Sequence, residues 1–451
     1  MLAQIIPAIA SQLVALLYSL ADTFFVGKLN SPDQTAAVTV AGAVFLLLTA
    51  LSNLFGVGGA SLVSRKLGLG KADEAAEVSS FCFWYGAFTA IVFGLFVGVF
   101  SEPILKLVGA KQASLEYAKG YLFYSVALGA LPTVATTMLA NLTRAEGASL
   151  AAGIGVMLGC FVNIALDPIF VLPSYLDMGA AGAGAATALS NAAGLMYFIL
   201  YIARGRRKRG TVLSLNPKSL KRARRHAGEV LKIGLPSALQ YLLTVVAVSA
   251  QLSFVSKYGN EAVAALGITK KLDQLPLFFS IGVANGLLPL IGYNYAAGNF
   301  ERTENTFRFG AAISLGFALL CVLVYELFAP ALTSLFIDNA KTVDYAAAFL
   351  RRMVTAMPFM SICYPMITKF QAMGKAKESL TVSVMRKGVL DIPLFFLTDA
   401  IKPLYGCMWV QPIVDSVSLA AALILNRGIV KKDKQKCEDR GDAQTESKRE
   451  G

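Results

Sequence analysis

The chain has 451 residues, of which 56% are hydrophobic and 15% are charged, and its formal net charge is +13. Its mean hydropathy is +0.60. Soluble domains carry about 25% charged residues, so this composition excludes a soluble protein and indicates an integral membrane protein.

Long apolar segments follow one another along the chain up to about residue 426. A helix needs about 20 apolar residues to cross the hydrocarbon of a bilayer. Apolar runs of this length without alternation favour helices over strands. We therefore predict an all-α integral membrane protein with twelve transmembrane helices, near residues 4–27, 38–62, 78–101, 118–142, 149–172, 179–203, 229–255, 262–296, 306–330, 345–368, 378–399 and 406–426.

The second half of the chain repeats the pattern of the first half. The glycine-containing segment Gly56–Ala75 has its counterpart in Ala284–Thr303, about 228 positions later, and Pro7 is matched by Pro236 at nearly the same offset. Internal repeats in an apolar chain are typical of transporters in which two related lobes move around a central site. The twelve helices therefore divide into two six-helix lobes that a pseudo-twofold axis relates.

Composition divides the chain into four regions: an N-terminal lobe over 1–203, a basic linker over 204–228, a C-terminal lobe over 229–427 and a charged tail over 428–451. The tail lacks apolar periodicity, so we expect it to be disordered. Most Lys and Arg residues lie on the side of the termini and the linker, and the positive-inside rule places this side in the cytosol. The linker is expected to contact anionic lipid headgroups. It has no interleaved aromatic residues, so no nucleic-acid partner is expected.

The residues that most enzymes and ATP-driven pumps require are absent from the predicted helices. The only histidine, His226, lies in the linker, so no helix carries a histidine for a catalytic pair or a zinc site. The chain has no GxxxxGK[ST] motif, and its six cysteines show no CxxC spacing. We predict no enzymatic activity and no cofactor. An ion gradient is the expected energy source, and ionisable residues inside the membrane would respond to it.

Four polar residues of the first half lie at similar depths in their predicted helices. At a rise of about 1.5 Å per residue, Asp22, Asn163, Asp167 and Thr187 lie roughly 8 to 13 Å below the outer helix ends. Asn163 and Asp167 are four positions apart and share one helix face. Two carboxylates with an amide and a hydroxyl can share a proton or surround a sodium ion with oxygen atoms. Alternatively, each side chain bonds only to a neighbouring backbone group.

These residues resemble the multidrug and toxic compound extrusion (MATE) family over about residues 1–426. The resemblance rests on the order and spacing of several strings, namely Pro7 with Asp22 in Leu20–Gly27, Asn163–Pro168, Ala186–Thr187 and Pro289–Tyr295. It implies a twelve-helix transporter that exports bulky, often cationic organic compounds in exchange for protons or sodium ions. It also implies an ion-coupling site at Asp22, Asn163, Asp167 and Thr187, and bending of the first helix at Pro7. We expect a monomer in the plasma membrane.

The predicted helices of the second half carry their own charged residues. These are Lys270, Lys271 and Asp273 on the eighth helix, Arg386, Lys387 and Asp391 on the eleventh, and Asp415 on the twelfth. We expect most of them to pair with one another. Asp391 lies one helical turn from Arg386 and Lys387, so an ion pair is predicted there. A role in coupling or substrate binding is the alternative for Asp391, Lys270, Lys271 and Asp273.

Two other functions remain open. A lipid-linked oligosaccharide flippase of the same superfamily would share the architecture, but it would line its cavity with several cationic residues for a pyrophosphate. The interiors of the first six helices offer acids and no Lys or Arg, which disfavours this function. A membrane receptor or scaffold would have no need of buried carboxylates at one depth.

The charge asymmetry predicts that both termini and the linker face the cytosol. Cysteine labelling of whole cells with a membrane-impermeant reagent would test this orientation. We expect Lys111→Cys, in the loop after the third helix, to be labelled and Ser219→Cys, in the linker, to be protected. The reverse pattern would show that the orientation is inverted.

Overall fold

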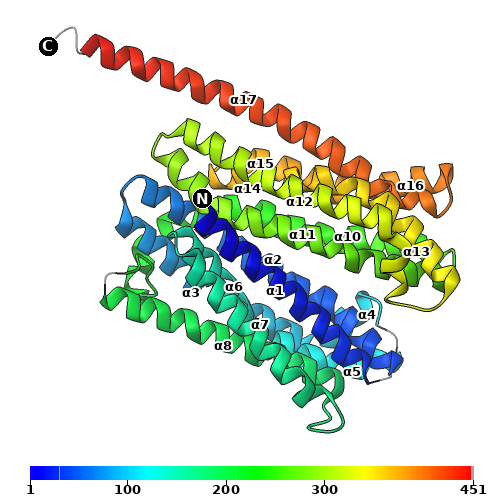
Figure 1. Ribbon diagram of the computed structural model, residues 1–451. Helices are drawn as coiled ribbons and strands as arrows, with labels where there is room; N and C mark the ends of the chain where they lie inside the picture. The colour runs from blue at the N-terminus through cyan, green and yellow to red at the C-terminus, as the bar shows by residue number, and fades with distance from the viewer. Residues whose placement is uncertain (30, 111, 209, 448–451) are drawn as a thin grey trace.

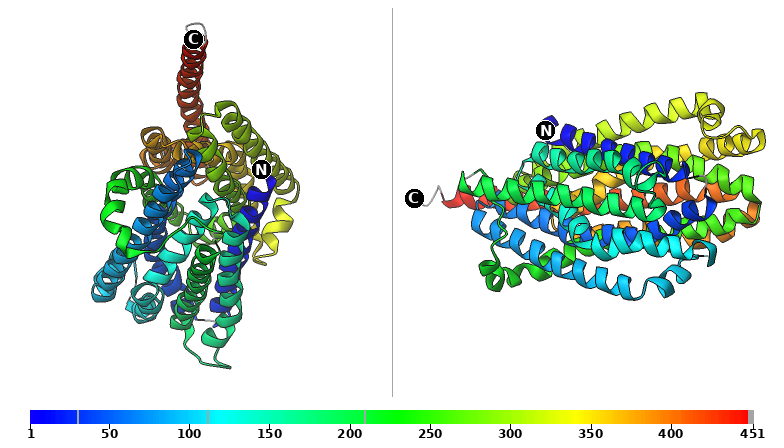
Figure 2. Two further views of the ribbon diagram at one scale, coloured as in Figure 1. Left: turned by 90° about the vertical axis from the view of Figure 1, so that its left-hand side faces the viewer. Right: turned by 90° about the horizontal axis from the view of Figure 1, so that it is seen from below.

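The computed structural model describes residues 1–447 except 30, 111 and 209, and the regular structure in this part of the chain is entirely helical. The helices form two bundles that lie side by side, with the first half of the chain in one and the second half in the other (Figure 1). The two termini and the linker lie at the same end of the helices (Figures 1 and 2). The predicted all-α fold with two six-helix lobes is confirmed.

The first lobe consists of α1 (Leu2–Gly27), α2 (Pro32–Gly68), α3 (Ala72–Val99), α4 (Ser101–Leu107), α5 (Gln112–Leu122), the π-helix η1 (Phe123–Leu128), α6 (Ala130–Ala145), α7 (Ser149–Val171) and α8 (Gly179–Arg207). The linker contains η2 (Pro217–Ser219), α9 (Leu220–Ala223) and η3 (Arg224–His226). The second lobe consists of α10 (Ala227–Ser256), α11 (Asn260–Ala296), α12 (Phe300–Ser334), α13 (Ala340–Met353), η4 (Val354–Ala356), α14 (Met357–Ala372), α15 (Ala376–Val384), the π-helix η5 (Met385–Val389), α16 (Asp391–Ile401), η6 (Tyr405–Met408) and α17 (Val410–Ser447).

The twelve predicted spans correspond to nine single helices and three interrupted ones. Nine of the described helices are long and apolar enough to cross a membrane alone, and α5 and α6 form a tenth span bent by 53°. Pro132 lies in the first turn of α6, where a missing N–H breaks no helical hydrogen bond. The two remaining predicted spans, 345–368 and 378–399, fall on α13 with α14 and on α15 with α16. The second of these breaks at Gly388, whose φ of 125° suits only glycine.

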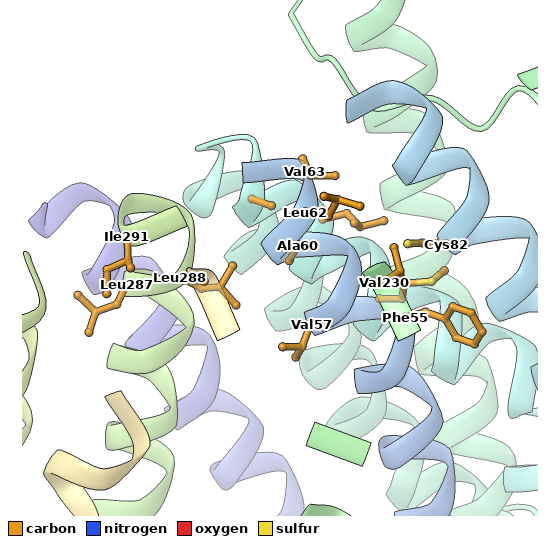
Figure 3. Close-up of a cluster of buried hydrophobic side chains, with 14 of the residues drawn as sticks. Phe55, Val57, Ala60, Leu62, Val63, Cys82, Val230, Leu287, Leu288 and Ile291 are labelled. Atoms are coloured by element: carbon orange, nitrogen blue, oxygen red, sulfur yellow. The ribbon is translucent and has the colours of Figure 1, made fainter. Parts of the chain in front are cut away.

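The lobes contact each other through reciprocal pairs of helices, α1 with α11 and α2 with α10. Two glycines at equivalent positions of the repeat, Gly58 on α2 and Gly286 on α11, allow this approach. A Cβ atom on Gly58 would collide with the carbonyl oxygen of Val230, and one on Gly286 would lie 2.7 Å from Cα of Ile5. The cluster of buried apolar side chains around these contacts draws on both lobes (Figure 3). The duplication seen in the sequence therefore forms the interface between the lobes.

The linker packs against the first lobe. Ser79 on α3 donates to the carbonyl of Ser214 at 3.2 Å and accepts from its N–H at 2.8 Å. The Glu146 carboxylate accepts from the hydroxyl of Thr211 at 2.6 Å and from the N–H of Val212 at 3.0 Å. Burial raises the pKa of the Glu146 carboxyl, which lies just beyond the end of α6. The segment that joins the lobes is thus anchored to one of them.

The disordered tail predicted over 428–451 differs from the structure, in which α17 continues to Ser447. Lys, Glu and Gln together make up ten of the 24 residues of this segment, and these residues have high helix propensity. A helix that has already formed in the apolar part of α17 can therefore propagate without a new nucleation step. Residues 448–451 lie outside the described part, as does Lys111.

Candidate functional site

A cavity of about 700 Å³ lies between the two lobes. The first lobe contributes wall residues from α1, α2, α6, α7 and α8, and the second lobe contributes residues from α10, α11, α14, η5 and α17. Its aromatic side chains are Tyr18, Tyr241, Phe278 and Tyr364. A cavity of this size with mixed apolar and polar walls is typical of a small-molecule site.

Three of the four predicted coupling residues come together on the first-lobe side of this cavity. Asn163 and Asp167 lie on α7 and Thr187 on α8, and all three side chains are at most 1% exposed. One orientation of the Asn163 amide places its nitrogen 3.5 Å from the hydroxyl of Thr187 and 3.4 Å from that of Ser190. After a 180° turn, the nitrogen donates to Asp167 at 2.9 Å and the oxygen accepts from the N–H of Thr187 at 3.2 Å. The second orientation satisfies the carboxylate, so we adopt it.

Asp22, the fourth residue, reaches the same group from α1. It lies close enough to Asp167 for the two carboxylates to repel each other. Its Oδ1 atom is buried and has no hydrogen-bond donor among the described residues. Within the described part of the chain, no Lys or Arg forms an ion pair with Asp22 or Asp167. The two carboxylates therefore lack the cation that would offset their burial in a membrane.

Sequence reasoning missed three side chains around these carboxylates. Tyr18 and Tyr121 both contact Thr187 and lie near Asp22 and Asp167, and the Ser190 hydroxyl donates to the carbonyl of Thr187 at 2.9 Å. Spacing could have revealed Tyr18, which lies four residues before Asp22 on one helix face. Nothing in the sequence pairs Tyr121 with this group, because the packing of α5 against α8 brings it there.

The cluster lies behind the cavity wall rather than in it. Asn163, Ser190 and Tyr18 line the cavity, whereas Asp22 and Asp167 are absent from its lining. The described residues contain no group of three His, Cys, Asp or Glu side chains that could hold a metal ion. The oxygen donors available here are two carboxylates, one amide and several hydroxyls. Such hard oxygen ligands suit a proton or a weakly bound alkali cation better than a transition metal.

On the second-lobe side, a hydrogen-bonded chain of charged and neutral polar residues joins η5 to α17. Arg386, which is 1% exposed, donates through Nε to Asp415 at 2.7 Å and lies over the ring of Tyr364. Gln411 donates to the other oxygen of Asp415 at 2.8 Å and accepts from Lys387 at 2.6 Å. The partner of Arg386 is therefore Asp415.

The predicted ion pair of Asp391 with Arg386 or Lys387 is wrong. Asp391 is buried at the start of α16 and accepts a hydrogen bond from the backbone N–H of Gly388 at 2.9 Å. The one-turn spacing fails because Lys387 and Gly388 have non-helical dihedral angles, which removes Asp391 from the helical register of Arg386. The carboxylate instead binds the backbone of the break that precedes α16.

The remaining candidate residues of the second lobe separate into two groups. Lys270 and Asp273 line the cavity from α11, whereas Lys271 does not.

Arg144 on α6, in the first lobe, also lines the cavity, which corrects the expectation that the first lobe offers no cation there. That residue lies two positions beyond the end predicted for the fourth span, 118–142, so it was not counted among the helix residues.

Comparison with known proteins decides the family. The MatE family model matches residues 7–169 and 236–397, once in each half of the chain. The chain belongs to the MatE family. The two matches also confirm the internal duplication, and they identify the protein as a membrane transporter.

Relatives and solved structures of this family match nearly the whole chain. The multidrug export protein MepA of Staphylococcus aureus (strain MRSA252) is 29% identical over 93% of this chain and 91% of its own. A multidrug resistance MATE family transporter in an outward-facing conformation superposes with a TM-score of 0.89 at 24% identity, covering 96% of each chain. A transporter of the MOP superfamily from Pyrococcus furiosus, described as having a binding pocket of reverse polarity, gives a TM-score of 0.86 at 24% identity and the same coverage.

The ion pair in the second lobe of this MatE protein predicts a difference between two aspartates. Asp415→Asn leaves the buried Arg386 without a counter-charge and should lower the free energy of unfolding by about 3–5 kcal/mol. Asp391→Asn keeps an oxygen that can accept from Gly388 and should cost about 1 kcal/mol or less. Thermal unfolding of the purified variants in detergent measures both effects, and equal losses would contradict the assignment.

Proposed function

We propose that this MatE protein is a secondary active antiporter. It exports organic compounds from the cell in exchange for protons or sodium ions, by alternating access of the central cavity to the two sides of the plasma membrane. It acts as a monomer with both termini and the linker in the cytosol. The observation that carries the proposal is the pair of carboxylates, Asp22 and Asp167, buried in the first lobe without a cationic partner.

Two carboxylates in one apolar site cannot both remain charged without a cation, because each ionised group lacks water and repels the other. A shared proton or a bound sodium ion removes this cost. The described residues hold no Lys or Arg in ion-pair contact with either acid, so an ion from solution is the available source of positive charge. The site therefore favours occupancy whenever the ion concentration on the accessible side is high.

The position of the cluster behind the cavity wall gives a route from ion binding to substrate release. Asn163 belongs both to the wall and to the hydrogen-bonded group around Asp167. On α1, Tyr18 faces the cavity, while Asp22 belongs to the ion cluster. Binding an ion changes the charge that these wall residues contact, and a substrate that prefers the other wall arrangement is then released.

Pro7 offers a place for α1 to bend during this change. It lies inside α1, five residues after the helix begins, so the helix lacks one backbone hydrogen bond there. The helix also contacts α7 in its own lobe and α11 in the other lobe. A bend at Pro7 would thus move Tyr18 and Asp22 relative to both lobes.

The broad substrate class follows from the relatives, which are named as multidrug export proteins. The family match, with its repeat in both halves, favours export of organic compounds over transfer of lipid-linked oligosaccharides. The cationic character that the resemblance implies for the substrates finds no support in the cavity wall, where four basic residues, Arg144, Lys270, Arg386 and Lys387, face two acidic ones, Asp273 and Asp415.

Removal of either carboxylate should abolish coupling. Asp22→Asn and Asp167→Asn keep the side-chain volume but lose the titratable group, so export from proteoliposomes under a pH or sodium gradient should fall at least about tenfold. Asp73→Asn, at an exposed carboxylate in the first turn of α3, is the matched control and should export normally. Undiminished export by both cluster variants under either gradient would refute the proposed site.

A further inference from the structure

Two lysines on the second-lobe wall of the central cavity are only partly satisfied by the protein. Lys270 makes no hydrogen bond and no ion pair with the described residues. Lys387 donates to Gln411, a neutral side chain. The two ammonium groups lie near enough to repel each other, and both side chains are partly exposed. The cavity therefore presents two neighbouring positive charges to whatever occupies it.

The nearby carboxylates are engaged elsewhere, with one exception. Asp415 is fully buried and accepts from Arg386 and Gln411. Asp391 accepts from the backbone of Gly388 and is not part of the wall. Only Asp273 lines the cavity with a carboxylate that forms no hydrogen bond or ion pair with the described residues. For a ligand, the accessible charges of this wall are thus two lysines against one aspartate.

The first-lobe wall adds a third positive charge and no accessible negative one. Arg144 lines the cavity and contacts two neutral side chains, Asn141 at 3.0 Å and Ser11 at 3.3 Å. Asp22 and Asp167 lie behind the wall. A cationic ligand would find positive charge on both sides of the cavity, and like charges in a site of low dielectric repel strongly.

We propose that the central cavity binds amphiphilic organic compounds that carry an anionic group, a carboxylate, sulfonate or phosphate, and that Lys270 and Lys387 bind this group. The inference deepens the proposed export function by naming the substrate class of the same cavity. Charge-assisted hydrogen bonds from two ammonium groups stabilise such an anion. The aromatic side chains Tyr241, Phe278 and Tyr364 line the same cavity and accommodate the apolar part of the compound.

Equilibrium binding of three matched probes to the full-length protein tests the proposal without any ion gradient. The probes are a fluorescent aminocoumarin with a free carboxylate, its neutral methyl ester and its cationic dimethylaminoethyl ester. Binding is measured by fluorescence anisotropy in phosphatidylcholine nanodiscs, with empty nanodiscs as the blank. We expect the carboxylate to bind at least about tenfold more tightly than either ester, because it alone gains hydrogen bonds between charged groups.

Three lysine variants then assign the anion to its partners. Lys270→Gln and Lys387→Gln should each weaken binding of the carboxylate by about tenfold and leave the affinity of the methyl ester unchanged. Lys271→Gln is the matched control, because this neighbour on the same helix does not line the cavity, and it should bind all three probes as the unmodified protein does. Size-exclusion elution verifies that each variant is folded.

The outcomes separate this inference from the export function. Equal affinity for the three probes, or tightest binding of the cationic ester by the unmodified protein, would overturn the inference even if gradient-driven export is observed. A carboxylate preference that Lys270→Gln and Lys387→Gln both leave intact would also overturn it. A preference that both variants remove would support it, even if no gradient drives export.

Discussion

An ionised side chain inside a membrane requires a counter-charge or a proton, and the two lobes of this protein meet that requirement differently. In the second lobe, the Arg386 guanidinium is bound to Asp415, so both charges are offset within the protein. In the first lobe, Asp22 and Asp167 lie together and no described cation pairs with them. In the proposed antiport, only the first lobe therefore depends on an ion from solution. This asymmetry arises in two halves that share one architecture.

The interface between the lobes follows from the duplication. The two contacts, α1 with α11 and α2 with α10, are equivalent in the repeat. The same glycine position of the repeat therefore lies in both of them, as Gly286 on α11 and as Gly58 on α2. Gly58 lies against Val230, near the start of α10, and Gly286 lies against Ile5, near the start of α1. Close backbone contact is lost as a whole when one lobe rotates, because packed interfaces have few intermediate arrangements. In the proposed alternating access, these contacts close the cavity at this end, while the ion cluster lies within its own lobe.

Much of this arrangement could be predicted from the sequence, because helices in membranes are specified by long apolar runs and by polar residues at fixed spacing. The twelve spans, the repeat and the grouping of Asn163, Asp167 and Thr187 followed from such local patterns. The partner of Arg386 did not, since the break at Gly388 shifts Asp391 out of register and the true partner, Asp415, lies on another helix. Arg144 was missed because the membrane boundary of a helix is poorly defined by hydropathy. The tail was misjudged because charge alternation is compatible with both disorder and a helix.

In the proposed antiport, an ion in the first lobe and a substrate in the cavity exclude each other. Proton- and sodium-sensitive dyes in dilute buffer measure the ions that the purified protein releases when a compound that binds the cavity is added. We expect release of about one proton or one sodium ion per molecule of substrate bound, since linkage makes the exclusion reciprocal. We also expect no release from a variant that carries both Asp22→Asn and Asp167→Asn. Substrate binding without release of either ion from the unmodified protein would contradict the account.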